Sequence, residues 1–246
     1  MQYFKGLIFG DTGTGKTWFG GTLSALGKVA YLHADLSSPD TLALVPGERV
    51  LRFISTPDDA ARALKALRSK PEYAGAVFDG MTGFIQNTRD SLTGSRIDAV
   101  IRATQPMWGD VKEIARLFIK DFVALPMHIM LIALAQRDLD FLEPYKLDAM
   151  GEIARDKHGE PYPQYQVLPS LETKLRHEIG GQLNAVGYTF TRSRLKGVEY
   201  HLSFQKAGVD TKLCGCSIPD MVDPTFEKVW QIISKKEETN ARVPVP

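Results

Sequence analysis

The feature that most constrains the fold is a glycine-rich segment near the start of the chain, LIFGDTGTGKT at residues 7–17. An apolar stretch precedes it, and a helix is predicted after it, from Thr17 to Leu26. The spacing is that of a phosphate-binding loop, Gly10-x-x-x-x-Gly15-Lys16-Thr17. Glycines that adopt positive φ let successive N–H groups approach phosphate oxygens at a helix N-terminus. We expect positive φ at Gly10, Gly13 and Gly15. The predicted nucleotide-binding residues are Gly10, Asp11, Thr12, Gly13, Thr14, Gly15, Lys16, Thr17 and Trp18.

Two residues of this loop have specific predicted tasks with ATP and Mg²⁺. Lys16 is expected to reach the β- and γ-phosphates, and Thr17 to ligate the magnesium ion. The alternative is that the glycines only make a turn before a helix, and the strand and helix patterns on either side favour the phosphate loop.

Composition bounds the class of protein. The 246 residues include 43% hydrophobic and 24% charged residues with a net charge of +1, which is typical of a globular domain and gives no global signal for nucleic acid or membrane. No apolar run is long enough to span a membrane and no signal peptide is recognisable, so we expect a cytoplasmic protein. Cys214 and Cys216 are interpreted as small, semi-buried side chains, because a lone C-x-C offers only half of a structural zinc site.

Strand and helix patterns alternate through the first half of the chain. Besides the first strand, apolar or β-rich runs occur at residues 28–34, 48–55, 73–80 and 128–138. A helix is predicted to begin after Thr56, with Pro57 at its first position and basic residues in its last turn. We therefore predict an α/β fold, a three-layer P-loop sandwich with a mostly parallel central sheet.

The second half of the chain is predicted to extend this sheet with an antiparallel hairpin, residues 185–205, that turns near residues 195–197. Before the hairpin, a long loop is expected at about residues 138–169, followed by a helix over 170–181 capped by Ser170. A last helix is expected from Asp223 to Ser234. The predicted organisation is one domain, residues 1–235, followed by a flexible tail at 236–246.

Polar residues that end the parallel strands are the candidate catalytic residues, because ligands bind at the carboxyl edge of such a sheet. Asp79 follows an apolar strand and is the predicted second magnesium residue; its alternative is a turn-forming aspartate before Gly80. Gly80 stands where many ring ATPases carry a glutamate, so the base must come from elsewhere. We predict Asp35, ahead of Asp40 and Asp11. Gln136 is the predicted γ-phosphate sensor, or simply a polar strand end.

The order of these residues resembles the RecA superfamily, and more narrowly the short phage P-loop ATPases that act as RecA-type single-strand annealing proteins or minimal recombinases. The resemblance covers roughly Phe4 to Ile233 and is carried by the loop, the acid after the second strand, "VFDGMT" and the apolar strand that ends in Gln136. It implies a RecA-like ATPase core without a preceding domain. In that family the second-strand motif is Asp-Ala-Glu, whose glutamate is the base. Here "HAD" occupies that place, so Asp35 would act with a side chain one methylene shorter.

The resemblance also implies single-stranded DNA as a partner, bound by the segments after Asp79 and Gln136. In the long loop, aromatic rings could stack on bases while cations contact phosphates. Acidic residues such as Glu143 and Glu152 dilute this charge, and a lid over the nucleotide is the alternative. The predicted DNA-binding residues are Arg137, Phe141, Tyr145, Lys146, Arg155 and Lys157.

A further implication of the resemblance is a homo-oligomer with ATP at the subunit interface. A lysine of the neighbouring subunit, Lys212 or as second choice Lys206, would stabilise the γ-phosphate in trans; a solvated lysine in a turn is the alternative.

The leading hypothesis is thus an ATP- and Mg²⁺-dependent, single-strand-DNA-binding ATPase in phage DNA recombination, in the host cytoplasm, with a phage or host single-strand-binding protein as a further partner. Two alternatives remain. One is a small-molecule or nucleotide kinase with residues 138–165 as its lid, and the other is a non-hydrolysing nucleotide-dependent switch or assembly module.

Overall fold

The structure is a computed structural model. It describes residues 2–35, 37–69, 72–93, 105–139, 145–148, 150–162, 164–171, 173–195, 197–206, 209–213 and 217–241. The predictions for Cys214, Cys216 and Phe141 lie outside these residues.

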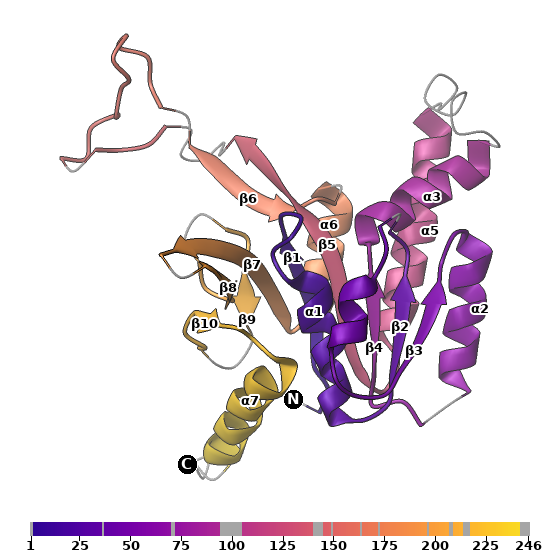
Figure 1. Cartoon of the computed structure of the whole chain (residues 1–246). Coiled ribbons are helices and arrows are strands. Elements are labelled where there is room, and N and C mark those ends of the chain that lie inside the picture. Colours follow the sequence, from indigo (N-terminus) through magenta and orange to yellow (C-terminus); the bar gives the residue numbers. More distant parts are fainter. Residues whose placement is uncertain are drawn as a thin grey trace.

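The first half of the chain alternates strands with helices (Figure 1). Its elements are β1 (Lys5–Gly10), α1 (Lys16–Gly21), η1 (Thr22–Leu26), β2 (Val29–His33), η2 (Asp40–Leu44), β3 (Arg49–Phe53), α2 (Pro57–Arg68), β4 (Gly75–Asp79), α3 (Met81–Thr93), α5 (Gln105–Val123) and β5 (His128–Leu139). The second half contributes β6 (Tyr165–Pro169), α6 (Thr173–Gln182), β7 (Ala185–Arg194), β8 (Gly197–Ser203), β9 (Lys212–Leu213), β10 (Met221–Val222) and α7 (Phe226–Ala241).

Within the described residues these strands form one sheet, in the order β10-β8-β7-β1-β5-β4-β2-β3. The strands from β3 to β7 run parallel, and β8 and β10 add antiparallel pairs at the far edge. Two further short strands lie outside this order. Strand β6 pairs with β5 and strand β9 pairs with β7, both in antiparallel orientation. The predicted α/β fold with a mostly parallel sheet and a C-terminal antiparallel hairpin is confirmed. Strand β1, which precedes the glycine-rich segment, lies near the centre of the sheet, between β5 and β7.

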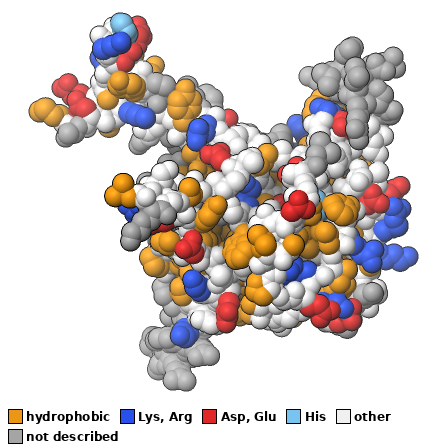
Figure 2. Space-filling view, viewed as in Figure 1, with side chains coloured by type: hydrophobic (Ala, Val, Ile, Leu, Met, Phe, Trp, Pro, Cys, Tyr) orange, Lys and Arg blue, Asp and Glu red, His pale blue; other side chains and the backbone are white. Residues whose placement is uncertain are grey.

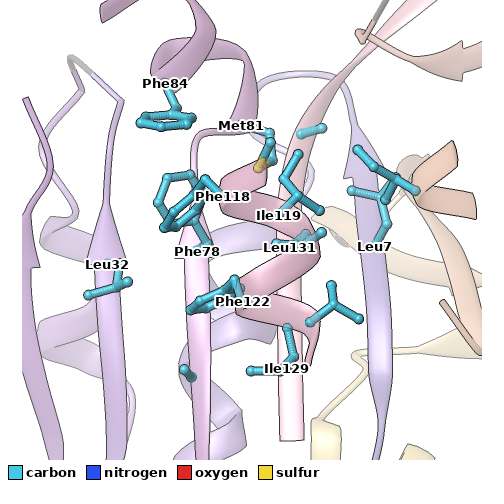
Figure 3. Close-up of a cluster of buried hydrophobic side chains, with 14 of the residues drawn as sticks. Leu7, Leu32, Phe78, Met81, Phe84, Phe118, Ile119, Phe122, Ile129 and Leu131 are labelled. Carbon is cyan, nitrogen blue, oxygen red and sulfur yellow. The ribbon is translucent and has the colours of Figure 1, made fainter. Parts of the chain in front are cut away.

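Helices cover both faces of the sheet and enclose two cores. On one face, Phe78 of β4 packs against Phe118 of α5 with ring centroids 4.8 Å apart, and Phe84 and Phe122 complete the aromatic group (Figure 3). On the other face, α1 and α7 pack through side chains such as Phe19 and Phe226. Burial on both faces explains why the central strands are continuous apolar runs.

Helix α2 begins as its sequence predicts. Thr56 accepts a hydrogen bond from the Asp59 backbone N–H, and the Asp59 carboxylate accepts one from the Thr56 N–H, with Pro57 at the first helical position. This reciprocal cap satisfies backbone donors that the first turn leaves without helical partners.

Several predicted boundaries are corrected. The segment expected to be a loop over residues 138–169 includes β6, which pairs antiparallel with the extended end of β5. Helix α6 begins at Thr173, not after Ser170, and continues through both glycines to Gln182. The helix after the loop ends at Gly21 and continues as the 3-10 turn η1. The last helix, α7, begins at Phe226, not at Asp223, and continues past Ser234 to Ala241. The hairpin turn near residues 195–197 is confirmed.

The described part of the chain contains no helix that is both long and apolar enough to cross a membrane.

Candidate functional site

The glycine-rich loop joins β1 to α1 and turns through two left-handed glycines. Gly13 has φ 77° and Gly15 has φ 85°, a conformation that side chains other than glycine adopt only with strain. Gly10 does not have positive φ. A Cβ at Gly10 would instead collide with the backbone oxygen and Oγ1 of Thr189 on the neighbouring strand β7. Gly10 is therefore required for close packing rather than for its backbone angle, which corrects the prediction.

The hydroxyls around this loop fix its shape. Thr14 Oγ1 donates to the Asp11 carbonyl at 2.8 Å and lies 2.8 Å from Thr189 Oγ1. Tyr200 of β8 lies across Gly15, because a Cβ there would be 3.2 Å from the tyrosine ring. The antiparallel hairpin thus forms one wall of the loop.

Lys16 is buried, and its ammonium donates to the carbonyls of Gly10 at 2.9 Å and Asp11 at 2.7 Å. Burial lowers the pKa of Lys16, while the carboxylates of Asp79, Asp11 and Asp35 oppose this shift. The ammonium therefore lies within the loop and within electrostatic reach of all three candidate acids.

Thr17 and Asp79 are brought together from sequence positions that are far apart. Thr17 Oγ1 donates to Asp79 Oδ2 at 2.8 Å, and Tyr31 Oη donates to the same oxygen at 2.5 Å. Asp79 is 4% exposed and Tyr31 is fully buried. Burial raises the pKa of the Tyr31 phenol well above its ordinary value, and the Asp79 carboxylate adds to the effect. Tyr31 is therefore a neutral donor that holds the carboxylate toward Thr17.

Sequence reasoning missed Tyr31. The available signal was its hydroxyl in the middle of an apolar strand, because a buried tyrosine usually requires a hydrogen-bond partner. The sequence alone did not say that this partner is Asp79 of the neighbouring strand β4.

Asp35 follows β2 and packs against the start of α3. Gly80 has φ 104°, and a Cβ there would lie 2.8 Å from the Asp35 backbone nitrogen. A Cβ at Gly83 would lie 2.7 Å from the Ala34 carbonyl. The position after Asp79 therefore cannot hold a glutamate without moving the backbone that carries Asp35. Asp35 also lines a pocket of about 220 Å³ at the ends of β2 and β3.

Consecutive residues at the end of β5 have different surroundings. Gln136 Nε2 donates to Asp138 Oδ2 at 2.8 Å, and Gln136 lines a second pocket next to α3 and α5. Arg137 forms an ion pair with Asp11 in the loop, with 3.3 Å between NH2 and Oδ2. Burial raises the pKa of Tyr188, an effect that Asp11 reinforces and Arg137 opposes, so the three groups are neighbours. Arg137, predicted to bind DNA, thus lies beside the phosphate loop.

Four of the other predicted DNA-binding residues belong to a segment that extends away from the body, residues 145–148 and 150–162, here called the arm (Figure 1). Hydrophobic, basic and acidic side chains are mixed on its surface (Figure 2). Tyr145, Lys146, Arg155 and Lys157 are all exposed. The structure therefore does not bring them to the phosphate loop.

Two successive turns of the same design build the arm. Asp148 Oδ1 accepts from the backbone N–H groups of Met150 and Glu152, and Asp156 Oδ1 accepts in the same way from His158 and Glu160. Each turn also contains a left-handed glycine: φ is 83° at Gly151 and 84° at Gly159. This repeat of Asp-x-x-Gly-Glu is short, and sequence reasoning missed it.

The predicted trans-acting lysines are engaged within their own chain. Lys212 donates to the carbonyls of Gly180 and Leu183 at the end of α6, at 2.8 and 2.9 Å. Its strand β9 pairs with the first residues of β7, which lie beside the amino end of β1. The ammonium of Lys206 lies 3.4 Å from the centroid of the Phe190 ring. The same ammonium lies 5.0 Å from the centroid of the Tyr188 ring.

Comparisons with known proteins give fold similarity at low identity. No protein-family model matches the sequence, and no curated protein matches it. Among solved structures, the chain is similar to a KaiC-like protein from the hyperthermophilic archaeon Pyrococcus horikoshii, with a TM-score of 0.49, 10% identity, and coverage of 88% of this chain and 83% of that one. It is also similar to the RadB recombinase, with a TM-score of 0.46, 10% identity and coverage of 88% and 84%. The class assigned here rests on the chain's own strand order and loop geometry, which are those of an α/β P-loop protein.

Proposed function

We propose that the protein is an ATP- and Mg²⁺-dependent ATPase of RecA type that binds single-stranded DNA and acts in phage DNA recombination, by annealing or strand exchange. The observation that carries this proposal is the hydrogen bond between Thr17 and Asp79 beside the buried ammonium of Lys16. A phosphate loop, a cation, a hydroxyl and a carboxylate at one sheet edge are the parts that phosphoryl transfer requires.

Thr17 and Asp79 would hold the magnesium ion. A hydroxyl and a carboxylate oxygen 2.8 Å apart fit the oxygen ligands that Mg²⁺ prefers, with water and phosphate oxygens as its other ligands. When bound, the ion neutralises charge on the β- and γ-phosphate oxygens. Tyr31 keeps the Asp79 carboxylate in place, and Lys16 exchanges its loop carbonyls for phosphate oxygens.

Asp35 is the proposed residue that orients the attacking water. Its electrostatic coupling to Lys16 supports this role, because that coupling requires the carboxylate to lie near the phosphate loop. Asp40 and Asp11 are the weaker choices for this role. The task is positioning, in which small displacements are costly, so the shorter aspartate predicts slow turnover.

Arg137 is proposed to contact the phosphates. The pair between Arg137 and Asp11 supports this, because a phosphate chain in the loop can replace the carboxylate as the partner of the guanidinium. The sensor role proposed for Gln136 has less support, since its amide already donates to Asp138.

Single-stranded DNA is proposed to bind along the arm. The exposed cations of Lys146, Arg155 and Lys157 would contact phosphates, and Tyr145 would stack on a base. Two of the four acids in the arm, Asp148 and Asp156, accept the backbone hydrogen bonds that build its two turns, which gives these acids a structural task. The proposed assembly remains a homo-oligomer with ATP at the interface. A trans role for Lys212 would first require breaking its two bonds to α6.

A small-molecule or nucleotide kinase is the second candidate. Arg137 beside the loop would serve as a phosphate clamp, and the pocket that contains Gln136 offers room for an acceptor. Such an enzyme would release ADP only with an acceptor and would not respond to DNA.

Mg²⁺-dependent ATP turnover, measured with and without a long single-stranded oligonucleotide, tests the proposal. We expect turnover that the oligonucleotide stimulates, stimulation that fades as salt rises, and no turnover in Lys16→Ala. The double variant Arg155→Ala, Lys157→Ala should retain basal turnover and lose most of the stimulation. ATP-dependent DNA binding that persists fully in Lys16→Ala contradicts the mechanism. Turnover indifferent to DNA favours the kinase, and tight ATP binding without turnover favours a switch.

A further inference from the structure

A pocket of about 490 Å³ lies between α3, α5 and the junction of β6 with α6. None of its described lining residues belongs to the phosphate loop, and one of them is Gln136, the predicted γ-phosphate sensor. It is lined by Thr82, Ile85, Gln86, Trp108, Lys112, Gln136, Ser170, Leu171, Thr173 and Leu175.

The lining combines an apolar surface with neutral hydrogen-bonding groups. Trp108 is 38% exposed, and the aliphatic side chains of Ile85, Leu171 and Leu175 share the lining with it. Three hydroxyls and two amides also line it. The amide nitrogens donate within the chain, Gln86 to Asp90 and Gln136 to Asp138, so each amide offers its carbonyl oxygen to accept from the edge of a planar ring.

Charges of both signs lie around this pocket. Lys112 lines it, and the Arg89 guanidinium, 5.8 Å from the centroid of the Trp108 ring, forms an ion pair with Asp90 at 2.8 Å. No described lining residue is an aspartate or glutamate. The lining is therefore suited to a planar, polar ring.

We propose that this pocket binds a single unstacked nucleobase, with the base against Trp108 and its edge toward Gln86 and Gln136. The volume is that of a small-molecule site, and recognition of an unstacked base by an aromatic ring and edge hydrogen bonds is a common mode. The inference rests on the proposed function in that the base is expected to come from single-stranded DNA. A free nucleoside has the same chemistry and is the other source.

The alternation of β5 supports this assignment. Successive side chains of a strand point to opposite faces, so Gln136 lines the pocket while Arg137 reaches Asp11 in the loop. Gln136 therefore contributes to recognition of the base.

Fluorescence titration with 2-aminopurine tests the inference, because this base analogue is quenched when it stacks. The two probes are a single-stranded oligonucleotide containing one 2-aminopurine and free 2-aminopurine riboside, each titrated with the full chain. Trp108→Ala should weaken binding about tenfold or more, a loss of about 1.4 kcal/mol or more, while Trp108→Phe retains most of the affinity because a phenyl ring still stacks.

Leu117→Ala is the matched control, since Leu117 is 48% exposed on the same helix and does not line the pocket. It should bind both probes like the wild type, and thermal unfolding checks that each variant is folded. Binding of the oligonucleotide that depends on Trp108 supports a base from a strand. If only the riboside binds, and its binding depends on Trp108, the pocket binds a free nucleoside. That result would contradict the proposal that the base comes from single-stranded DNA.

If Trp108→Ala binds both probes like the wild type, or if wild-type protein with intact Mg²⁺-dependent ATP turnover binds neither, the inference is overturned. Failure of the proposed function gives a different result, namely no ATP turnover above the Lys16→Ala level whatever the fluorescence titration shows.

Discussion

The phosphate loop and the arm both turn on left-handed glycines, yet one glycine of the loop is packed where those of the arm are open. Gly15 has φ 85° and lies under the ring of Tyr200, whereas Gly151 and Gly159 in the arm, at 83° and 84°, have nothing within 4 Å of an added Cβ, as is also true of Gly13 in the loop. The same backbone angle is thus part of a packed site in one region and of a free-standing turn in the other. A local sequence pattern specifies a turn, but its neighbours decide whether the turn forms a binding site.

The largest expected effect comes from Gly10→Ala. The new methyl group would collide with the backbone of Thr189, which cannot move without disturbing β7. We expect the free energy of unfolding to fall by about 3 kcal/mol and nucleotide binding to be lost. Urea denaturation and ATP titration would measure the two effects.

Gly151→Ala is the matched control in the arm. The alanine would introduce backbone strain of about 1 kcal/mol, because the residue has positive φ. Since nothing lies within 4 Å of the added Cβ, this strain should destabilise the arm alone. Global unfolding and nucleotide binding should match the wild type. If the two variants lose equal amounts of unfolding free energy and of nucleotide binding, the distinction between a packed turn and a free-standing turn is contradicted.

A smaller effect is expected for Tyr31→Phe, which removes one donor from Asp79 and leaves the packing in place. The free energy of unfolding should fall by about 2 kcal/mol, as for a buried hydrogen bond to a charged group. Mg²⁺-dependent turnover should also fall, because the carboxylate loses a fixed orientation.

The pH dependence provides a separate test of Tyr31. Its pKa is raised in the folded state, so its contribution to stability is complete below the unfolded pKa of about 10 and is lost as the pH rises toward the folded value. Above about pH 10 the stability of the wild type should therefore fall more steeply than that of Tyr31→Phe. Parallel curves from urea denaturation would show that Tyr31 makes no such contribution.

The smallest expected effect comes from a pair of arginine variants that compares the two regions directly. Arg137→Ala should weaken ATP binding about tenfold and leave DNA binding nearly unchanged, because Arg137 pairs with the loop. Arg155→Ala should leave ATP binding unchanged and reduce the salt dependence of DNA binding by about one phosphate contact. Calorimetry with ATP and anisotropy with a labelled oligonucleotide would separate them. If Arg137→Ala instead weakens DNA binding and leaves ATP binding unchanged, Arg137 belongs to the DNA-binding surface.

The candidate site divides into residues that local patterns located and residues that they did not. The loop pattern located Lys16 and Thr17, and the end of an apolar strand located Asp79, because parallel strands carry their ligands at the carboxyl edge. Tyr31, Tyr200 and Thr189 were missed, since each acts across a strand pairing or a loop contact that no local pattern encodes. Lys212 was assigned from resemblance, and its actual partners are the carbonyls that end α6.

The sequence by itself determined the elements: the glycine loop, the apolar parallel strands, the cap of α2 and the C-terminal hairpin. These depend on backbone angles, periodicity and neighbours within a few residues. The tertiary structure decided which side chains share a site. It places Arg137, predicted to bind DNA, beside Asp11 of the phosphate loop, and it pairs Gln136, the predicted phosphate sensor, with Asp138. Alternation along β5 predicts that these two side chains point to opposite faces, but only the packing of α3, α5 and the phosphate loop around that strand sets which one faces the loop.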